Sequence, residues 1–277
     1  MNKMKKQNRF KILTFLLSTF LVSCSESMTN SSFLGVGERE VIFKFGILSV
    51  TRTTTSENLK TVFVDDDQIG VWGIKRGEED VIHTNLKYEY NKKEEKWSAE
   101  QSVTFPVDGS NLNFYAYYPY NAEIKNTSFE FAVKQDQSVE ERYNQSDLLL
   151  AVNDKATVED TFITLAFSHQ LALVEVNVEL PESETVVKVD ICAKKTATVD
   201  LVNQTVYVKE DEVADYITML EVGEGKFRAV VPAQNVITGK VFRIVTTDGE
   251  VNYTYWYKVS SPIVFELNKI NVFSISC

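Results

Sequence analysis

Few residues of this chain have the types and spacing that catalysis or metal binding requires. The two histidines, His83 and His169, are 86 positions apart, and His169 lies at a predicted strand junction, where a structural role is favoured. The sequence contains no HExxH, no cysteine pair at metal-ligand spacing, no GxSxG and no glycine-rich phosphate loop. The acidic run 65–67 offers hard oxygen ligands for calcium but lacks the ligand spacing of an EF-hand loop, and we interpret it as a solvated turn. The sequence therefore predicts a protein that is not an enzyme and that holds no metal or cofactor.

The residue with the clearest chemistry is Cys24. Five basic residues in the first 11 positions precede an apolar run over residues 12–22, which has the length of a signal-peptide core and is too short to span a bilayer. The run leads into Leu21-Val22-Ser23-Cys24, the pattern of a lipobox, in which the thiol accepts a diacylglyceryl group through a thioether. We predict a lipoprotein signal peptide over residues 1–23 and acylation of Cys24. The alternative is an ordinary signal peptide that ends in cysteine by chance.

Lipidation predicts a protein that is anchored to the outer membrane at the cell surface rather than one that spans a membrane. No later apolar stretch approaches the roughly 20 residues of a membrane helix. Removal of the signal peptide, which holds five basic and no acidic residues, changes the net charge from −10 to −15. Because such an acidic surface repels nucleic acid, we exclude nucleic-acid partners.

Residues 40–50 have the pattern of a strand with one apolar face, because Val41, Phe43 and Phe45 alternate with residues that point the other way. A polar, unpatterned stretch follows and contains Arg52, where a protease could enter. The alternative is that the strand is permanent and that Arg52 lies in an ordinary loop.

Strand patterns rich in Val, Ile, Thr, Tyr and Phe recur through the rest of the chain, and turn residues separate them. Asp248-Gly249 gives the strongest prediction of a tight hairpin. The pattern indicates an all-β protein of sandwich type. The predicted divisions are a signal peptide (1–23), a lipidated tether with a strand that could be cleaved off (24–52), an N-terminal β-sandwich domain (53–157) and a C-terminal β-sandwich domain (158–277).

Two aromatic runs, at residues 114–120 and 253–257, could serve as platforms for stacking sugars. In both runs, alternation places large apolar side chains on both faces of a strand, which is typical of a core strand. We therefore predict two core strands, with Trp256 on the opposite face from Tyr255 and Tyr257.

Six segments occur in an order that resembles the fimbrillin-like proteins of Bacteroidales, which are pilus subunits assembled from lipoprotein precursors. The segments are DQIGVW (67–72), NFYAYYPY (113–120), DQS (136–138), SDLLLA (146–151), LAFSH (165–169) and PAQ (232–234). The resemblance implies two transthyretin-like β-sandwich domains in series and no catalytic residues.

The resemblance also implies a mechanism of assembly. A protease would cut between Arg52 and Thr53, the strand with Val41, Phe43 and Phe45 would leave the groove it fills, and a strand of another pilin subunit would replace it. A fimbria would then be the final location, and a host or bacterial surface ligand could be its target. The chain offers no obvious extra strand to donate after residue 276, which favours an accessory, tip or anchor position.

Two questions stay open at the level of sequence. The alternative function is a surface glycan-binding lipoprotein that is not assembled into a pilus and that uses an exposed aromatic patch including Tyr117 or Trp256. Beyond Cys24 the cysteines are Cys192 and Cys277, which could form one disulfide bond or remain free.

Overall fold

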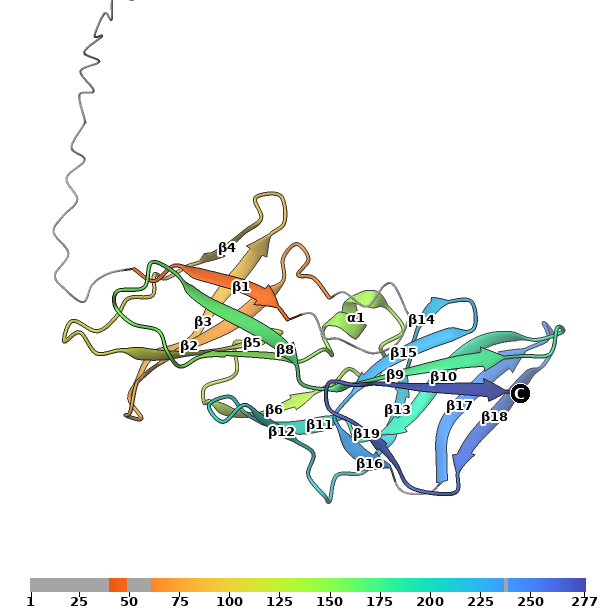
Figure 1. The fold of residues 1–277 in the computed structure, drawn as a ribbon. Coiled ribbons are helices and arrows are strands. Elements are labelled where there is room, and N and C mark those ends of the chain that lie inside the picture. Colours follow the sequence, from red (N-terminus) through yellow and green to blue (C-terminus); the bar gives the residue numbers. More distant parts are fainter. Residues whose placement is uncertain (1–39, 49–60, 237–238) are drawn as a thin grey trace, which may run out of the picture. The chain divides into compact units, whose positions relative to one another are not determined.

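Strands make up nearly all the regular structure of the residues that can be described. The computed structural model describes residues 40–48, 61–236 and 239–277 (Figure 1). Within these ranges there is one helix, α1 (Glu140–Asn144), whose five residues are too few to cross a membrane. The predicted all-β fold class is confirmed.

Several predicted features lie outside the described residues. These are the signal peptide over residues 1–23, the lipidation position Cys24, and the cleavage positions Arg52 and Thr53. The structure describes the predicted strand 40–50 only as far as residue 48.

The largest sheet has seven strands. In spatial order they are β1 (Phe43–Ile47), β8 (Ile163–His169), β7 (Leu149–Asn153), β5 (Leu112–Tyr118), β2 (Gln68–Lys75), β3 (Val81–Asn91) and β4 (Lys96–Ala99). All its neighbouring pairs are antiparallel except β1 and β8, which are parallel. A parallel neighbour cannot come from a tight hairpin, and β1 accordingly pairs with a strand from a distant part of the chain.

The central strand β5 is buried on both of its faces. Phe114 and Ala116 belong to a first buried cluster, which this sheet encloses, whereas Tyr115 and Tyr117 belong to a second cluster shared with later strands. All four side chains are buried. The prediction of a core strand for the aromatic run that begins at residue 114 is therefore confirmed.

The remaining strands form four further sheets. One four-stranded sheet has the order β13 (Asp215–Thr218), β10 (Thr185–Ala193), β17 (Gly239–Thr247) and β18 (Asn252–Val259). Another has the order β14 (Leu220–Gly223), β15 (Lys226–Val231), β9 (Ala172–Glu179) and β20 (Ile270–Ser276). The smaller sheets are β12 (Thr205–Tyr207), β11 (Thr196–Asp200) and β6 (Ser128–Ala132), and β16 (Gln234–Val236) with β19 (Ile263–Phe265).

The two four-stranded sheets contribute to one hydrophobic cluster, as the layers of a sandwich do. Ile191 and Phe242 enter it from one sheet, and Val176 and Phe227 enter it from the other. The rings of Phe242 and Phe273 have their centroids 5.0 Å apart, which joins β17 to β20.

Strand pairing crosses the predicted domain boundary at residue 158. Strand β8 follows this position in the sequence and pairs with β7, whereas β6 precedes it and pairs with β11. The division into two transthyretin-like domains stays a prediction.

The hairpin predicted at Asp248-Gly249 connects β17 and β18. Thr247 pairs with Asn252, so the connection has four residues rather than the two of a tight hairpin. Gly249 has a φ of 95°, a left-handed conformation that glycine adopts without strain.

The prediction that residues 253–257 form a core strand is wrong in part. Strand β18 lies at the edge of its sheet. Tyr255 and Tyr257 pack against the hydrophobic cluster, whereas Trp256 points away from it and Tyr253 is 38% exposed. Trp256 lies on the opposite face from Tyr255 and Tyr257, as predicted. On that face it contacts Lys240, Arg243 and Tyr216, which belong to the same sheet.

The missing side chain of Gly70 leaves room for the Tyr117 ring to pack over β2, which leads to a first prediction. A Cβ atom at Gly70 would overlap the Tyr117 ring and lie 2.5 Å from Asn85 Oδ1, and Tyr117 donates a 2.7 Å hydrogen bond to that oxygen. We expect Gly70→Ala to lower the free energy of unfolding in urea by about 1–3 kcal/mol. Gly46→Ala is the control, because nothing lies within 4 Å of a Cβ atom there. Equal effects of the two substitutions would contradict the close approach.

A second prediction concerns the hairpin carboxylate of Asp248, whose pKa is lowered to about 2. The Tyr253 hydroxyl donates to it at 2.7 Å, and the N–H groups of Val251 and Glu250 donate at 2.8 and 2.9 Å. We expect Tyr253→Phe to raise the pKa of Asp248 toward 3.8, as measured by a carboxyl NMR titration. Tyr207→Phe, on β12, should leave this pKa unchanged.

The sign of the accompanying stability change follows from the lowered pKa of Asp248. A carboxyl group with a lowered folded pKa stabilises the fold above its unfolded pKa, and this contribution is lost as the pH falls through the folded value. The Tyr253→Phe variant should therefore be less stable than the parent near neutral pH and equally stable below about pH 2.

Candidate functional site

Strand β1 lies at one edge of the seven-stranded sheet, beside β8 (Figure 1). Its register runs from Phe43 opposite Ile163 to Ile47 opposite Phe167. An edge strand is hydrogen-bonded on one side only, so alternate N–H and C=O groups of its backbone face away from the sheet. Besides this ladder, the Val41 N–H donates to the Val103 carbonyl at 2.7 Å.

The apolar side chains of β1 cover the first hydrophobic cluster. Val41 is buried, and Phe43, Phe45 and Ile47 are half-buried and packed against the cluster. The three residues predicted from alternation are thus on one face, and Ile47 is a fourth that the prediction did not include.

Aromatic contacts connect β1 to strands that are not its neighbours. The centroid of Phe43 lies 5.0 Å from that of Phe114 on β5, and the centroid of Phe45 lies 5.1 Å from that of Trp97 on β4. Both pairs are edge-to-face, the geometry that the ring quadrupole favours. Since β1 and β4 are the two edges of the sheet, the sheet curves until side chains from its edges meet.

The trough beneath β1 is therefore apolar and aromatic. It is formed by side chains from β3, β4, β5 and β8, which are Tyr88, Trp97, Phe114 and Phe167. Each apolar side chain that is fully buried from water contributes roughly 1.5–3 kcal/mol, so an uncovered trough of this kind favours a replacement strand.

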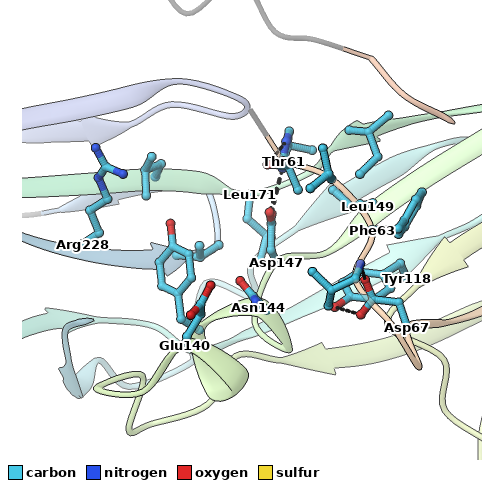
Figure 2. Close-up of a pocket in the computed structure, with 17 residues that line it drawn as sticks. Thr61, Phe63, Asp67, Tyr118, Glu140, Asn144, Asp147, Leu149, Leu171 and Arg228 are labelled. Carbon is cyan, nitrogen blue, oxygen red and sulfur yellow. Dashed lines mark hydrogen bonds and ion pairs between the residues drawn. The ribbon is translucent and has the colours of Figure 1, made fainter. Parts of the chain in front are cut away.

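A cavity of about 240 Å³ lies where Ile47 ends β1 (Figure 2). It is lined by residues of the segment 61–64, by α1, and by Asp147, His169 and Arg228. The cavity is mixed in character, because apolar side chains of β9 and β15 also line it.

His169 is central to the polar side of this cavity. Its Nδ1 lies 2.9 Å from the Asp147 carboxylate, and its Nε2 lies 3.2 Å from the Thr61 hydroxyl. Hydroxyl, imidazole and carboxylate also occur in this order in hydrolases. His169 is 4% exposed, and its two hydrogen bonds connect the end of β8 to Asp147 and Thr61; the structural role expected from sequence stays a prediction.

Two other charged groups of the cavity, Asp67 and Arg228, are also held by protein partners. Asp67 accepts hydrogen bonds from the Tyr118 hydroxyl at 3.0 Å and from the Val64 N–H at 2.7 Å. Burial nevertheless raises the pKa of Asp67 above its ordinary value. Arg228 is paired with Glu175 at 2.7 Å. The hydrogen bonds of Asp67 connect the segment that enters β2 to β5.

The remaining sequence candidates are dispersed. In the described ranges, no group of three His, Cys, Asp or Glu side chains is arranged to hold a metal ion. Cys192 and Cys277 are both free thiols, and burial raises the pKa of each. Tyr117 is completely buried, so it cannot belong to an exposed aromatic patch.

Solved structures with this fold are described as cell adhesion or fimbrial proteins of Bacteroides. A "putative cell adhesion protein" from Bacteroides uniformis aligns with a TM-score of 0.63 and 17% identity, over 87% of this chain and 94% of that one. One from Bacteroides ovatus has a TM-score of 0.61 and 14% identity, over 86% and 92%. A fimbrial protein from Bacteroides ovatus has a TM-score of 0.51 and 17% identity, over 86% and 49%. At these identities, the likeness shows a common fold.

The family is shown by sequence. The model of the fimbrillin-like family matches residues 51–277, which is most of the chain, and the protein therefore belongs to this family. The resemblance drawn from the six ordered segments is confirmed. No curated protein matches the chain significantly.

A third prediction tests the contribution of β1 to stability. We expect Phe45→Ala to lower the free energy of unfolding by about 2 kcal/mol, because a half-buried ring loses part of the 3–5 kcal/mol typical of a buried Phe→Ala change. Ile42→Ala is the matched control, since Ile42 is 59% exposed and adjoins the same strand. Urea unfolding of the uncleaved protein measures both. An Ile42 effect as large as that of Phe45 would argue against a one-sided strand.

Proposed function

We propose that this protein is a structural and adhesive subunit of a cell-surface fimbria, exported as a lipoprotein acylated at Cys24 and assembled by strand addition. The observation that carries the proposal is the position of β1. It is an edge strand with one strand neighbour among the described residues, and its side chains cover an aromatic trough.

Cleavage between Arg52 and Thr53 releases β1 together with the lipid. The trough then exposes Tyr88, Trp97 and Phe114, and β8 exposes an unpaired row of N–H and C=O groups. An edge with unpaired backbone groups beside an apolar trough is a template for a strand from another chain. Assembly with other fimbrial subunits follows from this chemistry.

Membership of the fimbrillin-like family supports this proposal, as does a fold shared with proteins described as fimbrial. The state of β20 supports an accessory, tip or anchor position within the fimbria. This strand is hydrogen-bonded in parallel to β9 of its own chain from Ile270 to Ser276, and a strand engaged in this way is not free for donation.

A fourth prediction tests the cleavage and its consequence. Protein recovered from the cell surface should begin at Thr53 and form multimers that resist SDS without heating. Arg52→Ala should leave the N-terminus at Cys24 and abolish the multimers, whereas Lys60→Ala, which changes another basic residue of the same segment, should alter neither. N-terminal sequencing and unheated gels measure both effects. Parental surface protein that still begins at Cys24 would refute the cleavage.

A further inference from the structure

Three side chains form a cluster on the outer face of the sheet β13-β10-β17-β18. The Arg243 guanidinium carbon lies 4.3 Å from the centre of the Tyr216 ring and 5.9 Å from the centre of the Trp256 ring. The centroids of the two rings are 5.7 Å apart. Tyr216 and Trp256 come from the two edge strands β13 and β18, so the rings reach toward each other across the middle of the sheet.

A buried carboxylate fixes this cluster in place. Asp190 is 1% exposed and accepts hydrogen bonds from Arg243 Nε at 2.8 Å and Nη2 at 2.7 Å. The Thr218 hydroxyl donates to its other oxygen at 2.8 Å. Because Arg243 is held by two bonds to one carboxylate oxygen, the rings that pack on its guanidinium are also held, and a ligand would find them already ordered.

The face is basic although the chain as a whole has a net charge of −10. Lys240 lies 3.9 Å from the centre of the Trp256 ring, and the exposed Lys258 lies opposite Lys240 in the register of β17 and β18. The Lys188 Nζ atom lies 3.3 Å from a carboxylate oxygen of Asp190. Two cations, Arg243 and Lys188, thus contact the Asp190 carboxylate, and two more, Lys240 and Lys258, lie on or beside the Trp256 strand.

The acidic groups nearest to this face have partners of their own. Asp136 is paired with Arg142 at 2.8 Å, and Asp215 with Lys195 at 3.1 Å. Neither pair cancels the charge of Lys240 and Lys258.

The other four-stranded sheet has no comparable surface cluster of rings and cations at its central ion pair. There Glu175 is bound to Arg228 at 2.7 Å and to Lys226 at 3.7 Å, the same combination of one carboxylate with one arginine and one lysine, but the cation–ring contacts of the described residues involve neither cation. Side chains that line the cavity at the end of β1 lie beside this pair. The cluster of Tyr216, Arg243 and Trp256 is therefore specific to one face of the molecule.

We infer that this face binds an acidic polysaccharide through its uronate residues. A sugar ring stacks the positive edge of its C–H bonds on the negative face of an aromatic ring. Trp256 supplies such a ring when the exposed Lys240 side chain, whose ammonium lies over it, turns to a sugar carboxylate, and the exposed Lys258 supplies a second cation for the same purpose. The open face of a sheet suits a polymer that lies across it. A protein with a negative net charge attracts an acidic polymer only where its surface is locally positive. The inference rests on the proposed function, because it names a class of ligand for the proposed adhesive subunit.

A fifth prediction tests this binding with tetragalacturonate as the probe and its carboxyl-reduced form as the matched ligand. The purified uncleaved protein, which retains β1, should bind tetragalacturonate saturably by calorimetry in about 50 mM salt, and more weakly in about 200 mM salt because charge pairs are screened. The carboxyl-reduced form should bind at least about tenfold more weakly.

Variants locate the binding on this face. Trp256→Ala should weaken binding of tetragalacturonate about tenfold or more. The double variant K240Q/K258Q changes only exposed side chains, so it should stay folded, and it should remove most of the salt dependence. The matched control is Lys44→Gln, because Lys44 also lies over an aromatic ring, 3.4 Å from the centre of Phe162, on a different sheet. This control should bind as the parent does.

The outcomes separate this inference from the proposed function. Absence of saturable binding, equal binding of the reduced probe, or a preference for sialyllactose would overturn the inference. SDS-resistant multimers in that case would leave the fimbrial proposal standing. Tetragalacturonate binding by a protein that never forms multimers would support the inference and count against the fimbrial proposal.

Discussion

The contact between β1 and the curved seven-stranded sheet is the interaction on which the first part of the structure depends. Phe43 and Phe45 contact rings from the middle and the far edge of the sheet, so one short strand completes a cluster to which five strands contribute. The strand is nevertheless attached weakly through its backbone, because an edge strand has one ladder. Removal of this strand would expose apolar side chains of the cluster to water. A replacement strand would need only one row of backbone hydrogen bonds.

A parallel edge strand occurs twice in the described chain. β1 pairs in parallel with β8, and β20 pairs in parallel with β9. β8 and β9 are consecutive strands separated only by Gln170 and Leu171. The two strands nearest the ends of the described chain therefore join the same pair of neighbouring strands. Because parallel pairing involves no hairpin, the proposed release of β1 would unfold no turn between β1 and β8.

The sequence predicted those features that local alternation controls, and it missed those that depend on distant partners. Val41, Phe43 and Phe45 share a face because the strand period is two, and residues 114–118 are buried because both their faces are apolar. Trp256 has the same local pattern, but its partners Tyr216 and Arg243 lie on other strands, and only the sheet register brings them together. An arginine and two lysines near an aromatic run was the one available sequence signal for this cluster.

The proposed assembly and the inferred ligand binding use separate strands in this molecule. Strand exchange at β1 alters a sheet that shares no strand with β13, β10, β17 and β18. Asp190, which orders Arg243 and through it both rings, is bonded within β10, β13 and β17 alone. Replacement of β1 by another chain therefore leaves the Trp256 face in its ordered state. If both proposals hold, the subunit would join a fimbria and keep its binding surface, because the apolar contacts proposed to drive strand exchange and the charges proposed to select a ligand lie in different sheets.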